Sequence, residues 1–175
     1  MAIKTIFLDR DGVINKEVNY LHKIGDFKFI DGIFDACLHF QTLGYKIIIL
    51  TNQSGIARGY YTVNDYKKLT QWMLSQFKNN NINILDASYC PHGPESSCKC
   101  RKPKPGMFID AKNKYLINMK DSWSIGDKET DIQAAKLSGV TNTILVRSGH
   151  YIDESNSKAS FIVDSIKQSK KIILT

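Results

Sequence analysis

Thr5-Ile6-Phe7-Leu8-Asp9-Arg10-Asp11-Gly12, near the start of the chain, is a short apolar run that ends in two aspartates and a glycine. A short apolar run closed by a glycine turn predicts a buried strand of a parallel sheet. Open α/β sheets bind ligands outside the carboxyl ends of their strands. Alternate strand residues share a side, so Asp9 and Asp11 can place two carboxylates around one cation, and Mg2+ prefers such oxygen ligands.

Two other structures fit part of this stretch. An aspartate-rich turn that merely caps a strand has a similar composition. A calcium-binding loop needs an oxygen ligand at its fifth position and glycine at its sixth, where this chain has Val13 and Ile14. The calcium loop is therefore excluded, and residues elsewhere in the chain must decide between a turn and a site.

The composition predicts one domain over residues 1–175, because 175 residues that are 42% hydrophobic can bury a single sizeable core. The net charge of +7 favours an anionic partner, but the lysines are scattered, so a phosphorylated small molecule accounts for it as well as nucleic acid does. The sequence has no room for a signal peptide before the first strand and no run long enough to span a membrane. We expect a cytoplasmic monomer that binds a small molecule and neither nucleic acid nor membrane.

Strands alternate with helices along the chain. Helical spacing of apolar residues predicts helices over residues 33–43, 62–79, 107–116 and 132–137. Short apolar runs predict further strands at residues 45–50, 86–89, 122–125, 143–146 and 161–163. Such alternation predicts a three-layer, Rossmann-like α/β sandwich with a mainly parallel sheet.

Several of these predicted strands end in reactive residues. Asp9 and Asp11 follow the first strand, Thr51 follows the second, Asp127 follows a later one, and Lys102 lies in a loop between strands. In a parallel sheet these residues converge on one edge. One carboxylate can then attack phosphorus and another can serve as acid and base. Mg2+ held among the carboxylates can cancel the repulsion between the anionic nucleophile and the anionic phosphate, while Thr51 and Lys102 can hold the equatorial phosphoryl oxygens.

These residues match, in order, the four motifs of the haloacid dehalogenase-like phosphatases over about residues 5–147: Asp9-Arg10-Asp11-Gly12, Thr51-Asn52, Lys102, and Gly126-Asp127 followed by Asp131. The resemblance implies that Asp9 is the nucleophile and Asp11 the general acid and base. It also implies Mg2+ ligands from Asp9, Asp127 and the backbone carbonyl of Asp11. Thr51 and Lys102 would steady the phosphoryl group. Asp131 either joins this site or complements a helix dipole.

Three cysteines and a histidine lie within eleven residues: Cys90, His92, Cys98 and Cys100. Zn2+ takes four such ligands in closed structural sites, which would stiffen the loop that leads into Arg101 and Lys102. A disulfide is disfavoured in a cytosolic chain and would not account for His92. Unligated thiols and an iron centre remain alternatives to zinc. Cys37 lies on a predicted apolar helix face and is expected to be a core thiol.

Residues 51–59 and 98–103 resemble the zinc-containing D-glycero-D-manno-heptose 1,7-bisphosphate 7-phosphatases, and the chain has no room for a lid domain between its motifs. The resemblance implies removal of the 7-phosphate in nucleotide-heptose synthesis for bacterial surface sugars such as lipopolysaccharide. Asn19 stands where many relatives have glycine, which leaves the preferred anomer open. Arg58 is either a solvated cation or a substrate contact. The residues implied to contact sugar or phosphate are Glu17, Val18, Asn19, Tyr20, Thr51, Asn52, Gln53, Ser54, Arg101, Lys102 and Lys128.

Other functions share some of these features. The histidinol phosphatases have the same Cys/His loop and the same Arg-Lys-Pro step, and a phosphatase acting on a nucleic-acid 3′ end would suit the positive charge. A zinc-stabilised binding module without catalysis is an alternative of another class. The run Ser54-Gly55-Ile56-Ala57-Arg58-Gly59 favours the heptose branch.

Overall fold

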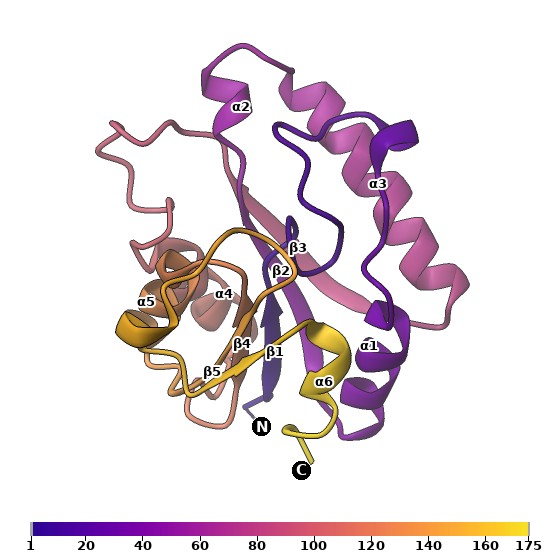
Figure 1. The fold of residues 1–175 in the computed structure, drawn as a ribbon, viewed down its shortest axis with the longest axis vertical. Coiled ribbons are helices and arrows are strands. Elements are labelled where there is room, and N and C mark those ends of the chain that lie inside the picture. Colours follow the sequence, from indigo (N-terminus) through magenta and orange to yellow (C-terminus); the bar gives the residue numbers. More distant parts are fainter. Residues whose placement is uncertain (1, 175) are drawn as a thin grey trace.

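A computed structural model describes residues 2–174 and contains a six-stranded sheet in the order β3-β2-β1-β4-β5-β6 (Figure 1). Every adjacent pair of strands is parallel, which confirms the predicted α/β class. The strands are β1 (Thr5–Leu8), β2 (Lys46–Asn52), β3 (Ile84–Cys90), β4 (Trp123–Gly126), β5 (Asn142–Val146) and β6 (Phe161–Val163).

Helices cover both faces of this sheet, as Figure 1 shows. One core packs β-strand residues against α1, α3 and α6, and a second core packs the other face against α4 and α5. The helices are α1 (Ile33–Thr42), α2 (Ser54–Ala57), α3 (Val63–Asn79), α4 (Gly106–Tyr115), α5 (Glu129–Ser138) and α6 (Ile166–Ser169), with the 3-10 turns η1 (Ile24–Asp26) and η2 (Glu154–Asn156).

The two cores explain why the strand sequences are continuously apolar. Ile6 and Leu8 of β1 lie in the core with α1, whereas Phe7 between them lies in the core with α4. Alternate side chains point to opposite faces, so a strand covered on both sides needs apolar residues at every position. Each fully buried residue of this size contributes about 1.5–3 kcal/mol through its burial.

Local capping sets the ends of the longer helices. At the start of α3 the Thr62 hydroxyl accepts from the backbone N–H of Asp65 at 3.1 Å, and the Asp65 carboxylate accepts from the Thr62 N–H at 2.9 Å. This is a capping box, which confirms the predicted helix start. Gly139 ends α5 at φ 100°, a conformation that glycine adopts without strain.

Several predicted boundaries are wrong, and α5 begins at Glu129 rather than at the predicted residue 132. The second strand was expected to end at Leu50, but pairing with β3 continues through Thr51 and Asn52. The third strand is longer than the predicted residues 86–89 and includes Cys90. Thr51 and the first cysteine of the Cys/His loop are therefore fixed by the sheet ladder rather than carried on free loops.

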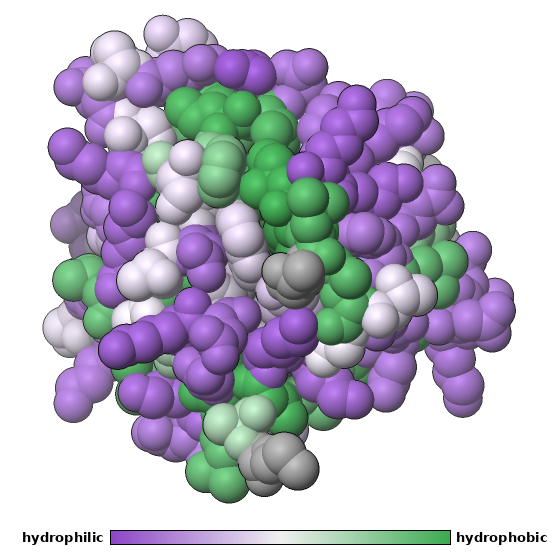
Figure 2. Space-filling model, turned by 90° about the horizontal axis from the view of Figure 1, so that it is seen from below, coloured by the Kyte–Doolittle hydropathy of each residue, from purple (hydrophilic) through white to green (hydrophobic). Residues whose placement is uncertain are grey.

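The two ends of the sheet differ. The strands begin near the chain termini, and Figure 2 shows hydrophobic residues between hydrophilic ones on that end of the molecule. The opposite end, where the strands finish, carries the predicted polar groups. Among the helices of residues 2–174, none combines the length and apolar character needed to cross a membrane.

Candidate active site

The predicted residues meet in one cavity of about 410 Å³ at the carboxyl ends of the strands. Every residue predicted to act in catalysis, in substrate contact or in Mg2+ binding lines this cavity. These residues are Asp9, Asp11, Glu17, Val18, Asn19, Tyr20, Thr51, Asn52, Gln53, Ser54, Arg101, Lys102, Asp127 and Lys128. Asp131, Tyr61 and His150 line it as well, whereas Arg58 lies outside the lining.

Lys102 is the buried cation at the centre of the site. Its Nζ lies 2.8 Å from Asp9 Oδ1 and 2.7 Å from Asp131 Oδ1, and it donates to the carbonyl of Leu50 at 2.7 Å. The Asn52 amide holds the backbone of Lys102 through two hydrogen bonds of 3.1 Å. Asn52, expected to contact substrate, thus also positions the lysine.

Burial dominates the electrostatics of these groups. It raises the pKa of Asp9 well above its ordinary value, and repulsion from the neighbouring aspartates adds to this rise. The positive charge of Lys102 lowers the pKa but does not cancel the effect of burial. Burial opposes the charge of Lys102, but Asp131 and Asp9 raise the pKa of its ammonium. The lysine is therefore a permanent positive charge, and a divalent cation would further favour the ionised form of Asp9.

Asp11 is held away from Lys102 by a different set of partners. The buried Arg10 donates to both oxygens of Asp11 from Nη2 at 2.9 Å, and Asn15 Nδ2 donates at 3.0 Å. Gln53 Nε2 bridges Asp11 Oδ2 at 3.1 Å and Thr51 Oγ1 at 2.8 Å. The two aspartates thus differ in environment, as a nucleophile and an acid–base group require.

Tyr61 completes this hydrogen-bond chain. Its hydroxyl donates to Gln53 Oε1 at 2.5 Å. Burial raises the pKa of Tyr61 to about 12, so the phenol keeps its proton at neutral pH. Because the Gln53 oxygen accepts from Tyr61, its nitrogen is the end that faces Thr51 and Asp11.

Three carboxylates offer a cation site. Asp9, Asp127 and Asp131 each have an oxygen within 4.8 Å of one another's. Asp127 is 1% exposed, and its Oδ1 is buried without a hydrogen-bond partner in the described structure. A buried carboxylate oxygen with no partner is costly unless a cation binds it, so these residues fit Mg2+. The side chain of Asp11 is not part of this group.

The loop over residues 17–20 forms the outer wall of the cavity. Tyr20 adopts a positive φ of 57°, and its ring lies 4.4 Å from that of Tyr60 between centroids. Burial raises the pKa of Glu17, whose neighbours include Asp11. Arg101 donates from Nη1 to the carbonyl of His92 at 3.2 Å, which links the cavity to the Cys/His loop.

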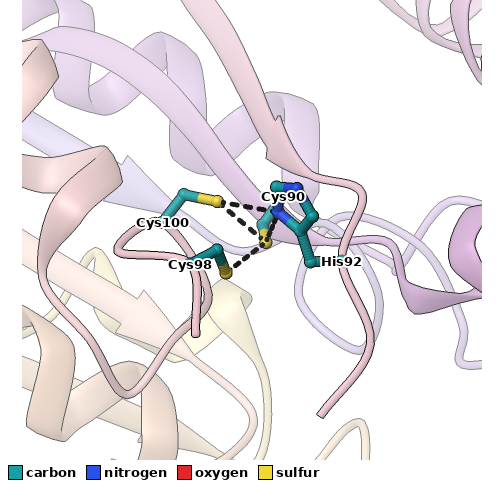
Figure 3. A group of neighbouring side chains, drawn as sticks. All are labelled: Cys90, His92, Cys98 and Cys100. Carbon is teal, nitrogen blue, oxygen red and sulfur yellow. Dashed lines mark hydrogen bonds between the residues drawn. The ribbon is translucent and has the colours of Figure 1, made fainter. Parts of the chain in front are cut away.

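The predicted Cys/His ligands do converge (Figure 3). The Sγ of Cys90 lies 3.7 Å from that of Cys98 and 3.0 Å from that of Cys100, and His92 Nδ1 lies 3.3 Å from Cys100 Sγ. Ligands about 2.3 Å from one tetrahedral ion lie roughly 3.8 Å apart. The four donors fit a zinc ion, and all four cysteines of the chain are free rather than disulfide-bonded.

The thiols of this cluster are not equivalent. Burial raises the pKa of Cys90 to about 12. Burial acts in the same direction on Cys98, but hydrogen bonds from the Arg101 backbone and the Ser96 side chain lower its pKa to about 6. Cys98 thus ionises more readily than Cys90, and a metal would have to displace the Cys90 proton.

Sequence reasoning missed two functional positions. His150 contacts Asp127, and Tyr61 orients Gln53, yet neither belongs to a motif. His150 follows β5 at the same sheet edge as the other site residues, so the strand-end rule was a signal for it. Tyr61 follows the short helix α2, where no motif or strand end pointed to a functional residue.

A parallel α/β sheet that carries several carboxylates and a buried lysine at one edge is the arrangement expected of a hydrolase that cleaves phosphate esters. A family model described as HAD-hydrolase-like matches residues 99–169. A D-glycero-alpha-D-manno-heptose-1,7-bisphosphate 7-phosphatase of Photorhabdus laumondii is 47% identical over 164 residues, 90% of each chain. The chain belongs to the haloacid dehalogenase-like phosphatases.

Other relatives also align over nearly the whole chain. A D-glycero-beta-D-manno-heptose-1,7-bisphosphate 7-phosphatase of Vibrio cholerae is 43% identical over 182 residues, covering 99% of this chain and 98% of the relative. A crystal structure of a D,D-heptose 1,7-bisphosphate phosphatase from B. bronchiseptica, complexed with magnesium and phosphate, superposes with a TM-score of 0.85. It is 27% identical and covers 98% of both chains.

Proposed function

We propose that this protein is a Mg2+-dependent phosphatase that removes the 7-phosphate of D-glycero-D-manno-heptose 1,7-bisphosphate through an aspartyl phosphate. The observation that carries the proposal is the convergence of Asp9, Asp11, Thr51, Lys102 and Asp127 in one cavity. The names of relatives that align over nearly the whole chain support the substrate. Residues 1–175 act as one domain in this proposal.

The chemistry follows from the two aspartates. The carboxylate of Asp9 attacks phosphorus, and the bond between phosphorus and the sugar oxygen breaks. Asp11 gives its proton to the departing sugar oxygen, then accepts a proton from the water that hydrolyses the aspartyl phosphate. Thr51 and Lys102 bind the phosphoryl oxygens and keep them in line with Asp9.

Asp9, Asp127 and the backbone carbonyl of Asp11 would hold Mg2+, with Asp131 alongside. The buried, unpartnered Oδ1 of Asp127 supports this assignment. When bound, Mg2+ offsets the repulsion between the anionic nucleophile and the anionic phosphate. Asp131, paired with Lys102 at 2.7 Å, keeps the lysine in position.

The Cys/His cluster would hold a structural Zn2+ through Cys90, His92, Cys98 and Cys100. Four protein ligands fill a tetrahedral site and leave no open position for substrate. The cluster ends two residues before Lys102, and the Arg101 side chain reaches back to the His92 carbonyl. Zinc therefore orders the loop that presents both cations to the substrate.

Loops at the sheet edge would select the sugar. Residues 17–20, Asn52, Gln53 and Ser54 line the cavity, together with the cations Arg101 and Lys128. A guanidinium can bind a second phosphate or sugar hydroxyls in a bidentate manner. We further propose a cytoplasmic location, since the proposed substrate is a charged metabolic intermediate. We also propose that the protein is a monomer.

Phosphate release from a substrate panel tests this proposal. The panel holds the α and β anomers of heptose bisphosphate, histidinol phosphate and a 3′-phosphorylated oligonucleotide, each with and without Mg2+. We expect preference for one heptose anomer, dependence on Mg2+, and loss of turnover in Asp9→Asn. Asp110→Asn, on the exposed surface of α4, is the matched control.

Other outcomes would change the assignment. Preference for histidinol phosphate would move the protein to that branch, and similar rates on all substrates would make it a generalist. If nothing in the panel were hydrolysed and Asp9→Asn behaved as the parent, a binding module without catalysis would be the better description.

A further inference from the structure

The loop that follows β5, residues 147–150, packs against the carboxylates of the site. The backbone N–H of Arg147 donates to the Val163 carbonyl at 2.9 Å, which keeps the start of the loop on the sheet. One residue later the Ser148 hydroxyl donates to the Gly12 carbonyl at 2.6 Å. The loop is thus fixed to β6 and to the turn that carries Asp9 and Asp11.

Glycine allows this loop to approach Asp127 closely. A Cβ atom at Gly149 would lie 2.1 Å from Asp127 Oδ2 and 2.6 Å from Asp127 Cβ. A Cβ atom at Gly12 would lie 2.5 Å from the same Oδ2. No side chain fits in these spaces, so the two glycines confine the Asp127 carboxylate to one place.

His150 then binds one oxygen of that carboxylate twice. Its backbone N–H lies 3.0 Å from Asp127 Oδ2, and its Nδ1 lies 2.6 Å from the same atom. Because an ionised carboxylate only accepts, Nδ1 is the donor of this bond. The other ring nitrogen, Nε2, lies 3.8 Å from Glu17 Oε1, which is beyond hydrogen-bond distance.

The second oxygen of Asp127 has no such partner. Oδ1 is buried and makes no hydrogen bond within the described structure. Asp127 also belongs to the group of three carboxylates whose oxygens lie within 4.8 Å of one another. Oδ2 of Asp127 is therefore bound by the protein, and Oδ1 is left to bind a cation.

We infer that His150 is a positioning residue, which holds Asp127 through Oδ2 so that Oδ1 is presented to the divalent cation. This rests on the proposed magnesium site. Hydrogen bonds to metal-ligating carboxylates fix their orientation, and losing one costs about 10–100-fold in metal affinity or activity. His150 sets cation affinity in this account and takes no part in the transfer of the phosphoryl group.

Cation binding in the absence of substrate tests the inference. Free Mn2+ is measured by electron paramagnetic resonance during titration of the protein, and Mg2+ is then used as a competitor. We expect His150→Ala to bind Mn2+ about 10–100-fold more weakly than the parent. His150→Asn should recover most of that loss, because its amide nitrogen is attached at the same carbon as Nδ1 of histidine.

His39→Ala is the matched control, because His39 lies on α1, away from the site, where its Nε2 contacts the Ile173 carbonyl. It should bind Mn2+ as the parent does. Thermal melting monitors folding, which His150→Ala is expected to retain because the side chain is 35% exposed. In steady-state assays the Mg2+ concentration for half-maximal activity should rise with the loss of affinity, with kcat at saturating Mg2+ nearly unchanged.

The outcomes separate this inference from the proposed function. A parent protein that binds no Mn2+ would overturn both. A parent that binds Mn2+ and a folded His150→Ala variant that binds it equally well would overturn the positioning role alone. A folded His150→Asn that is as weak as His150→Ala would show that the Nδ1 hydrogen bond does not set the affinity, which also overturns it.

Discussion

Arg10 lines the cavity with only 1% of the residue exposed. It donates to both oxygens of Asp11 and to the Leu21 carbonyl, while its Nη1 has no partner in the described structure. Burial opposes its charge, but Asp11 raises the pKa of the guanidinium. The guanidinium therefore stays charged, and its hydrogen bonds fix the carboxylate proposed as acid and base.

Replacing Arg10 with methionine should destabilise the protein and slow catalysis. Removal of one partner from a buried ion pair leaves the other uncompensated and costs about 3–5 kcal/mol. Urea denaturation should show this as a lower free energy of unfolding, and kcat should fall because Asp11 loses its orientation. Lys114→Met, which breaks an exposed pair with Asp86, is the control and should change stability little. Equal effects of the two substitutions would contradict the role of Arg10.

The site residues that sequence could predict are those at strand ends. Asp9, Asp11, Thr51 and Asp127 stand where a parallel sheet brings groups together, so their convergence follows from the strand pattern alone. The hydrogen-bond partners could not be predicted in this way. Gln53 was expected to contact substrate, but its place between Asp11, Thr51 and Tyr61 depends on how the following helix packs.

The short helix α2 sets the position of Tyr61, which in turn holds Gln53. A Cβ atom at Gly55 would lie 2.2 Å from Tyr61 Cε1 and 3.0 Å from Tyr20 Cδ1. Gly55→Ala should therefore displace Tyr61 and, through Gln53, disturb Thr51 and Asp11. A misplacement of about 1 Å can cost on the order of 10²-fold in rate, and we expect a loss of kcat/KM of that size.

Gly25→Ala is the matched control for this substitution, because a Cβ atom at Gly25 meets nothing within 4 Å. It should leave kcat/KM unchanged on heptose bisphosphate. If Gly55→Ala were as active as Gly25→Ala, the contact between α2 and Tyr61 would not be what organises Gln53.

The proposed zinc site predicts how the thiols of the Cys/His loop react. With zinc bound, Cys90, Cys98 and Cys100 should react slowly with a thiol reagent, and a strong chelator should release them. Cys37 should stay unreactive until the protein unfolds, since it is fully buried in α1 and its pKa is raised by that burial. Activity should fall together with zinc release, because the loop carries Arg101 and Lys102.

Cys37→Ala is the control and should release the same amount of zinc. Rapid reaction of the three loop thiols before chelation, with no metal found by elemental analysis, would contradict a zinc-ordered loop.

Short helices were the part of the fold that the sequence did not predict. The helices α2 and α6 have four residues each, too few for a periodic apolar pattern. They form because tertiary contacts hold them: Gly55 packs under Tyr61, and Ile166 lies in the core beside α1. Longer elements such as α3 were predictable because capping and apolar spacing agree over many residues.

Taken as a whole, the molecule separates stability from chemistry along the strand direction. Two apolar cores on opposite faces of the sheet hold the strands. The polar groups gather where the strands finish. The charges of the buried Lys102, Asp127 and Asp131 and of the partly buried Asp9 can be kept close together because the sheet, rather than the site, supplies the stabilising burial. The parallel arrangement of strands is thus what allows an aspartate after β1 to reach a phosphoryl group.

The stereochemical course at phosphorus tests this account most directly. A heptose bisphosphate with an isotopically chiral thiophosphate at position 7 is hydrolysed in labelled water with Mg2+, and the configuration of the released thiophosphate is determined. Attack by Asp9 followed by attack of water gives two inversions, so we expect overall retention. Inversion would mean that water displaces the sugar directly, and would contradict an aspartyl phosphate on Asp9.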